Sequence, residues 1–236
     1  MIEDTRSPLA VSPAEFRGHL EAIARSGAKV LPVSRLSDES ESASASDAFA
    51  ITFDDGYASV ARFAAPVLRD FGFPFAVFVV TSRVGRDNSW PAQPSWVPRR
   101  PLLDWGQIEG LAAIGADIGS HTVSHPDLTR LSRSEVDSEM EHSRREIETR
   151  LGRAPVVFAY PGGRVDEASR AIAGRLFSAS FGTRHARMRA RDDRAELPRV
   201  EICYFRSVRR FRRLFSPSID VRLAARRGLR ALRSAL

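Results

Sequence analysis

The chain is poor in cysteine and in long apolar runs, and each shortage excludes a class of protein. Its single cysteine, Cys203, cannot form an intrachain disulfide framework or a cysteine-built zinc finger. No stretch comes near the roughly 18 consecutive apolar residues of a membrane-spanning helix. Residues 1–6 carry acids where a secretory signal has a basic region, which predicts a cytosolic protein.

Lysine is also nearly absent, so arginine supplies almost all of the positive charge. Residues 184–236 hold 16 arginines against 5 acidic residues, whereas residues 1–183 hold 20 basic and 24 acidic residues. The positive sign of the net charge of +7 therefore comes from the C-terminal part. Because the mildly acidic body shows no basic groove pattern, we expect no nucleic-acid partner.

Short apolar runs alternate with amphipathic helical patterns along most of the chain. A capping box from Ser12 to Glu15 opens the first helix, and Gly27 ends it. Strands are predicted over 48–53, 73–80, 116–120, 155–160, 176–181 and 197–204, with helices between most of them. This order predicts a parallel α/β architecture, and at least six such units fit one barrel better than an open sheet.

We divide the chain into three parts within this single-domain fold. A lead-in helix and a polar loop occupy residues 1–47, the loop being the low-complexity segment 37–47. The barrel occupies residues 48–205, and a basic amphipathic tail occupies residues 206–236.

Polar groups follow three of the predicted strands. Asp54, Asp55 and Gly56 follow the first, His121 and His125 follow another, and the sequence Tyr-Pro-Gly-Gly at 160–163 follows a third. The carboxyl ends of parallel barrel strands share one face, where active sites lie. Each motif alone is commonly a turn or a solvated pair, but their joint occurrence predicts one converging site.

Two histidines and one carboxylate suit a divalent ion such as zinc and leave coordination positions open for water and substrate. Two adjacent aspartates in a tight turn point in different directions, so one can bind metal while the other acts as a base. Gly162 and Gly163 let backbone N–H groups approach a developing oxyanion.

These motifs resemble those of the polysaccharide deacetylases, the NodB-homology domains of carbohydrate esterase family 4. The resemblance is carried by TFDDGY at 52–57, SHTVSHPDL at 120–128 and FAYPGG at 158–163. LPRVEI at 197–202 is similar to the closing strand of one branch of that family. The resemblance covers roughly residues 10–205 and implies a distorted (β/α)7 barrel.

The resemblance also implies a role for each matching residue. Asp55, His121 and His125 would hold a divalent metal, with zinc as the first choice, and Asp54 would be the general base. The substrate would be an N-acetyl group on a sugar or glycan, hydrolysed to an amine and acetate. Its carbonyl oxygen would meet a backbone N–H near Gly162.

Two departures from the family pattern concern catalysis. Many members carry, at the position of Ala159, an arginine that orients the base, and they have a catalytic-acid histidine in a late motif that residues 197–202 lack. We predict that Arg199 replaces the missing arginine, because the last strand of a closed barrel lies beside the first. His185, expected in a loop, is a possible acid.

The remaining aromatic and histidine residues receive more general assignments. We expect His19 and His142 on helix surfaces and Trp105 in the core. The candidate substrate-binding residues are Tyr57, Tyr160, Pro161, Trp90 and Trp96, with both tryptophans in the irregular loop 83–101.

Two other functions stay open beside deacetylation. One is hydrolysis of another non-peptide C–N bond, and the other is a degenerate deacetylase that only binds carbohydrate. The tail leaves a further choice, since its apolar stripe with interspersed arginines is typical of a helix that lies on an anionic membrane, here the inner face. The alternative is a terminal helix that closes the barrel, with its arginines solvated.

Overall fold

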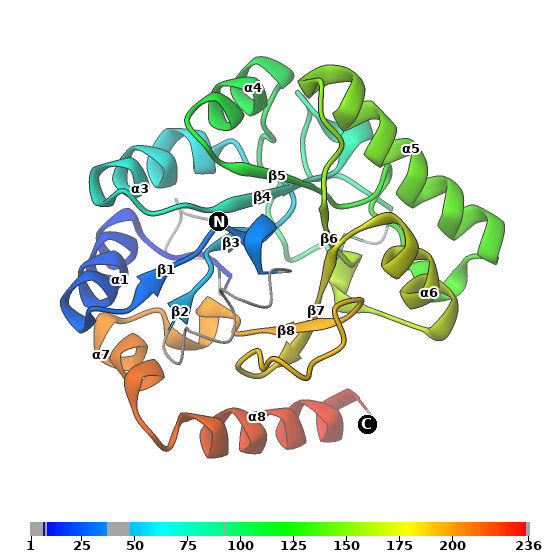
Figure 1. Ribbon diagram of the computed structural model, residues 1–236. Helices are drawn as coiled ribbons and strands as arrows, with labels where there is room; N and C mark the ends of the chain where they lie inside the picture. Colours follow the sequence, from blue (N-terminus) through cyan, green and yellow to red (C-terminus); the bar gives the residue numbers. More distant parts are fainter. Residues whose placement is uncertain (1–6, 8, 37–47, 92, 235–236) are drawn as a thin grey trace.

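The computed structural model describes residues 7, 9–36, 48–91 and 93–234, which build a curled parallel main sheet covered by helices and a separate two-stranded sheet. The main sheet has six strands in the order β3-β4-β5-β6-β7-β8. Their bounds are β3 (Thr52–Phe53), β4 (Ala76–Val79), β5 (Asp117–Ser120), β6 (Val157–Ala159), β7 (Ala179–His185) and β8 (Leu197–Arg199). The strands curl into a half-barrel (Figure 1), which confirms the predicted α/β class and single domain.

The single strand predicted over 48–53 is wrong, because the structure contains two short strands there. β2 (Ala48–Phe49) pairs with β1 (Lys29–Val30), and β3 pairs with β4. The backbone changes partner between them, since the carbonyl of Phe49 accepts from Leu31 and that of Ile51 accepts from Ala76. The predicted polar loop 37–47 lies outside the described residues.

Helices pack on the outer face of the sheet, as expected for parallel strands joined by crossovers (Figure 1). Capping boxes open four of them, at Ser12, Asp104, Ser132 and Asp166, the first of which the sequence analysis predicts. The helices are α1 (Pro13–Ser26), α3 (Ala65–Phe71), which continues the π-helical turn η2 (Val60–Ala64), α4 (Trp105–Ala113), α5 (Arg133–Leu151) and α6 (Glu167–Leu176).

Strand β4 shows how the core is divided by the sheet. Its alternate residues point to opposite faces, so Val77 and Val79 join the cluster under the helices while Phe78 joins the barrel interior. The short helix η1 (Val33–Arg35) places Val33 in that interior cluster and lies near the centre of the ring of strands in Figure 1. The barrel interior is therefore a packed core, which leaves the strand ends for chemistry.

Further short helical turns lie in the connections, and one of them, η5, carries Pro161 and Gly162 of the predicted site. They are η3 (Thr81–Arg83), η4 (Leu128–Arg130), η5 (Pro161–Gly163), η6 (Ile202–Phe205) and η7 (Arg212–Phe215). The last strand is shorter than the predicted 197–204, because β8 ends at Arg199 and the chain then turns into η6.

The C-terminal tail packs against the barrel through α7 (Val208–Phe211) and α8 (Ile219–Ser234). Ile219 and Leu223 are buried, and the Arg227 guanidinium donates to the carbonyl of His185 at 3.0 Å. The first half of the apolar stripe, with Ile219 and Leu223, thus packs on the barrel. This agrees with the interpretation of the tail as a terminal helix that closes the barrel. Within the described ranges, no helix is long and apolar enough to cross a membrane.

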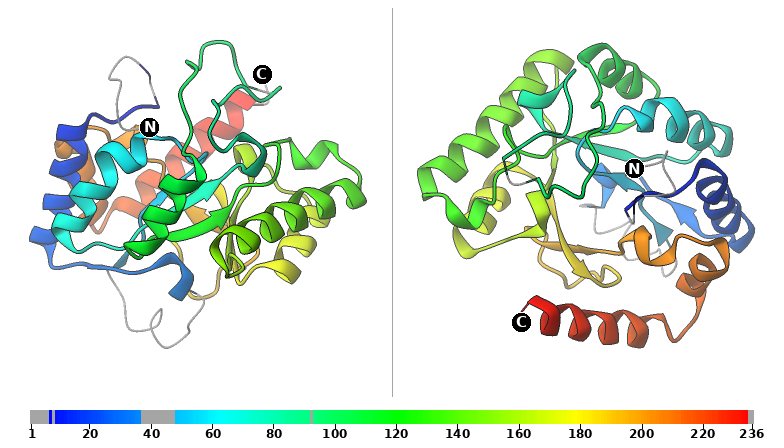
Figure 2. Two further views of the ribbon diagram at one scale, coloured as in Figure 1. Left: turned by 90° about the horizontal axis from the view of Figure 1, so that it is seen from above. Right: turned by 180° about the vertical axis from the view of Figure 1, so that it is seen from behind.

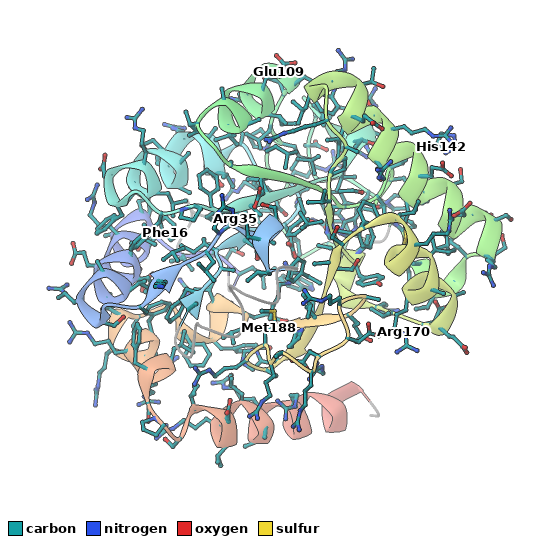
Figure 3. All side chains as sticks on the ribbon, in the orientation of Figure 1. Phe16, Arg35, Glu109, His142, Arg170 and Met188 are labelled. Atoms are coloured by element: carbon teal, nitrogen blue, oxygen red, sulfur yellow. The ribbon has the colours of Figure 1, made fainter. Side chains whose placement is uncertain are left out.

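The expectation that His19 lies on the surface is wrong. His19 is 2% exposed, its Nε2 donates to the carbonyl of Arg206 at 2.5 Å, and its ring stacks on Phe211. Burial lowers its pKa, and the bond to Arg206 only partly offsets this effect. His142, in contrast, is exposed on the outer side of α5, as predicted (Figure 3).

We predict that His19 makes the fold less stable in mild acid. Its pKa in the folded state lies below the ordinary 6.5, so the unfolded chain binds more protons and the free energy of unfolding falls as the pH drops through 6.5. Urea denaturation at pH 7.5 and 5.5 should show a smaller fall for His19→Gln than for the wild type. His142→Gln is the exposed control and should keep the wild-type fall; an unchanged fall in His19→Gln would contradict the prediction.

Candidate active site

The predicted polar groups meet at the carboxyl ends of the strands. Asp54 and Asp55 directly follow β3, and His121 directly follows β5. The irregular loop 83–101 stands out from the body at the top of the left view of Figure 2. This loop carries Trp90, whose ring stacks on His125, so it approaches the same group of residues.

Asp55, His121 and His125 form a three-donor cluster, with one ligand atom from each lying within 4.8 Å of the others. Asp55 Oδ1 is 3.4 Å from Nε2 of both histidines. Nδ1–H of His121 donates to the carbonyl of Ala159 at 2.7 Å, which leaves its Nε2 lone pair facing the cluster. One carboxylate and two imidazoles suit a borderline divalent cation such as zinc, so this donor set fits a metal.

The charges of this cluster shift the pKa values of its members. Burial alone would raise the pKa of Asp55 and lower that of His121. Their mutual contact outweighs burial in both cases, so the pKa of Asp55 is held far below its ordinary value and that of His121 is raised. Asp55 is therefore an anionic oxygen donor.

The backbone of the cluster is strained. Asp55, Thr122 and His125 have φ values of 69°, 70° and 60°, a left-handed region that costs a non-glycine residue about 1–2 kcal/mol. Such strain persists where the surroundings determine the conformation, as at ligand sites. Here the Thr122 hydroxyl accepts from the backbone N–H of His125 at 3.0 Å.

Glu139 of α5 holds the loop that carries His125, and the sequence analysis missed it. Its carboxylate accepts from the backbone N–H groups of Val123 and Ser124, both at 2.9 Å, and from the Ser124 hydroxyl at 2.7 Å. Glu139 could have been found in the sequence from its helical spacing, because it lies on the stripe of α5 that also holds the buried Val136 and Met140.

Asp54 forms a two-pronged ion pair with Arg199. Nη1 and Nη2 of Arg199 donate to Oδ1 and Oδ2 of Asp54 at 2.6 and 2.8 Å, and its Nε donates to the carbonyl of Gly182. The predicted contact between these two residues is thus present. Burial would raise the pKa of Asp54, but the guanidinium outweighs it and holds this pKa below its ordinary value.

The two tyrosines among the proposed substrate-binding residues are both buried, but only Tyr57 borders the cavity beside the aspartates. Tyr160 is 1% exposed, packs on Phe158 and donates its hydroxyl to the carbonyl of Ala195, so its side chain cannot line a substrate groove. Tyr57 is 8% exposed, and its hydroxyl accepts from Asn88.

The two tryptophans of the irregular loop differ sharply. Trp96 is 60% exposed, whereas Trp90 is 4% exposed and stacks on the His125 ring with centroids 4.1 Å apart. Trp90 therefore contacts the cluster itself instead of forming an open substrate wall.

The turn at 160–163 is shaped by its glycines. Pro161 is buried, while Gly162 is exposed and has a φ of 61°. A side chain added at Gly162 would meet no neighbouring atom within 4 Å. Gly163, in contrast, lies so close to Thr183 that any side chain there would clash. This turn follows β6, so its backbone lies at the same strand edge as the cluster.

His185 is not the loop residue that the sequence predicted. It is the last residue of β7, it is 1% exposed, and its Nδ1 accepts from the backbone N–H of Glu201. The rings of Tyr204 and Phe205 lie beside it. This enclosure argues against His185 as a proton donor to a substrate.

A small cavity of about 140 Å³ opens beside the two aspartates. It is lined by Leu9, Phe53, Asp54, Asp55, Tyr57 and Val60. The two carboxylates thus border a small, mostly apolar cavity.

The fold and the cluster together define a parallel α/β barrel with a candidate metal centre at the carboxyl ends of its strands. A sequence model of the polysaccharide deacetylases matches residues 42–177, more than half of the chain. The chain therefore belongs to the polysaccharide deacetylase family, as the motifs indicated.

Individual relatives are similar over part of their length. YxkH of Bacillus subtilis is 29% identical over 117 residues, which cover 50% of this chain and 37% of YxkH. Chitin deacetylase 1 of Cryptococcus neoformans is 30% identical over 126 residues, 53% of this chain and 23% of that protein. The Streptococcus pyogenes deacetylase PplD, solved with acetate, has a TM-score of 0.73 at 22% identity, covering 85% of this chain and 87% of PplD. The last comparison shows the shared fold.

We predict that the cluster binds metal as a unit and that Asp54 is not part of it. Asp55→Ala, His121→Ala and His125→Ala should each lose stoichiometric divalent metal, because each removes one of three donors. Asp54→Asn should keep the metal. Elemental analysis and calorimetric zinc titration check both statements; loss of metal in Asp54→Asn together with retention in Asp55→Asn would reverse the assignment.

Proposed function

We propose that the chain hydrolyses an N-acetyl group on a sugar or glycan, releasing acetate, with a divalent metal held by Asp55, His121 and His125. The observation that supports this most is the division of labour between adjacent carboxylates. Asp55 faces the two histidines, while Asp54 is fixed by Arg199 and stays out of the donor set. Family membership supports the deacetylation chemistry.

The residues of this chain supply distinct parts of the reaction. When bound, the metal would polarise the amide carbonyl and lower the pKa of water. Asp54 is anionic at neutral pH and held by two bonds to Arg199, so it can accept a proton from the attacking water. It then passes that proton to the amine nitrogen as the C–N bond breaks, which leaves acetate and a free amine.

Arg199 replaces, in this proposal, the arginine that many family members carry at the position of Ala159. The guanidinium reaches the same carboxylate from β8, and it also lies over the rings of Phe78 and Phe181 at 5.7 and 5.8 Å. Because Arg199 makes up for the missing arginine, Asp54 still has a partner that orients it as a base. This favours catalysis over a degenerate protein that only binds carbohydrate. The exposed backbone at Gly162 supports a role beside the carbonyl oxygen of the substrate.

Acetate release tests the proposed function directly. The name of one relative, chitin deacetylase 1, makes N-acetylglucosamine oligomers the first substrate to try. We predict zinc-dependent release of acetate by the wild type and a loss of about 10²–10⁴-fold in Asp54→Asn, the contribution typical of a general base. Asp54→Asn is the matched control because it is expected to keep the metal.

Three results would contradict this proposal in different ways. Hydrolysis of a cyclic amide without acetate release would favour the other C–N hydrolase. Oligosaccharide binding without turnover would favour a degenerate deacetylase. Equal turnover in the wild type and Asp54→Asn would remove Asp54 from the mechanism.

We also propose that the tail makes a peripheral contact with an anionic membrane, through charge more than through its apolar stripe. Arg209, Arg210, Arg212 and Arg213 are all exposed around η7, beside the exposed Phe215. Each arginine near an anionic surface contributes about 1 kcal/mol. The cytosolic location expected from the sequence stays a prediction and would place this contact at the inner face.

Sedimentation with vesicles at low salt tests the contact. The wild type should pellet with phosphatidylserine-containing vesicles and remain in solution with neutral ones. A variant with glutamine at all four exposed arginines should lose binding to the charged vesicles, since it removes roughly 4 kcal/mol of attraction. If the wild type stays in the supernatant with both kinds of vesicle, the membrane contact is wrong.

A further inference from the structure

The two histidines of the cluster are held by different means. His121 follows a strand and donates its Nδ1–H to the carbonyl of Ala159. Metal-binding histidines almost always have such a hydrogen bond on the second nitrogen, because it fixes both the tautomer and the ring orientation. His125 has no such bond, since its Nδ1 is buried and finds no hydrogen-bond partner among the described residues.

An aromatic contact on the face of the ring holds His125 instead of a hydrogen bond at its edge. The Trp90 ring lies nearly parallel to the His125 ring, with an interplanar angle of 24° and centroids 4.1 Å apart. His121 meets the same imidazole edge-on, at 5.0 Å and 69°. Rotation of the His125 ring would break the stacking, so its orientation depends on Trp90.

Trp90 is itself firmly placed, although it belongs to an irregular loop. It forms a small buried cluster with Tyr57, Val80 and Leu102. The neighbouring Asn88 is 0% exposed and cross-links the loop: its side chain donates to Tyr57 Oη and to the carbonyl of Pro98 and accepts from the backbone N–H of Arg100. The indole is therefore a fixed surface for the imidazole.

We propose that Trp90 is a positioning residue for the metal centre, orienting His125 by stacking as the Ala159 carbonyl orients His121. This inference rests on the metal centre of the proposed function. Loss of an outer partner of a metal-binding histidine typically lowers metal affinity 10–100-fold. Trp90 should have an effect of this size without contributing a ligand atom.

Cobalt titration tests the proposal without any substrate. Trp90→Leu keeps an apolar side chain in the buried cluster but removes the stacking, so its cobalt affinity should fall about 10–100-fold. Trp90→Phe should recover most of the affinity, because it restores an aromatic face. Trp96→Ala, in the same loop but 60% exposed in the wild type, is the matched control and should keep wild-type cobalt affinity.

Tryptophan fluorescence gives a second readout that does not depend on removing Trp90. In the double variant Trp96→Phe and Trp105→Phe, Trp90 is the one tryptophan that remains. Bound paramagnetic cobalt should quench its emission at one equivalent, because the indole lies directly against the His125 ring.

The outcomes separate the two proposals. If the wild type binds no cobalt at all, the metal centre of the proposed function is wrong. If it binds one equivalent but Trp90→Leu binds with affinity within about twofold of the wild type, or the Trp90 emission is not quenched, the positioning role is wrong and the metal centre stands.

Discussion

The structure depends on keeping two adjacent half-buried carboxylates charged at one end of the half-barrel. Like charges so close raise each other's pKa unless each has its own positive or hydrogen-bonding partner. Asp55 meets the two histidines, and Asp54 meets Arg199. Since β3 and β8 are the two ends of the sheet order, the Asp54–Arg199 pair also joins the edges that the strand hydrogen bonds leave apart. One interaction therefore links the two edges of the half-barrel and, in the proposed function, also orients the base.

In the proposed function, the same pair takes the place of the arginine that many family members carry at the position of Ala159. Ala159 is fully buried on β6, and its carbonyl accepts from His121. Arg199 reaches Asp54 from β8 through an interior lined by Phe78 and Phe181, whose ring faces attract the guanidinium. Because β8 is the edge strand at the opposite end of the sheet order from β3, an arginine on β8 can reach the carboxylate that follows β3 without any strand pairing between them.

Most of the fold was predictable because its signals are local. Capping boxes, apolar runs and polar residues after strands each report on a few neighbouring residues, and they gave the helices and the convergence of Asp55 with His121. The direction of the Tyr160 side chain could also have been predicted from the sequence. Residues two apart in a strand share a face, so Tyr160 points into the core with Phe158. The burial of His19 was not, because it comes from Phe211, which is 192 positions away along the chain.

The least predictable part is the irregular loop 83–101, where no periodicity indicates which side chain is buried. Trp90 and Trp96 look alike in sequence, yet only Trp90 reaches His125. His125 itself has a strained left-handed backbone, held by Thr122 and by the loop that Glu139 anchors. The orientation of this histidine thus comes from tertiary contacts more than from its own segment. Because Trp90 of this loop stacks directly on His125, a change in the loop would also reach the candidate metal site.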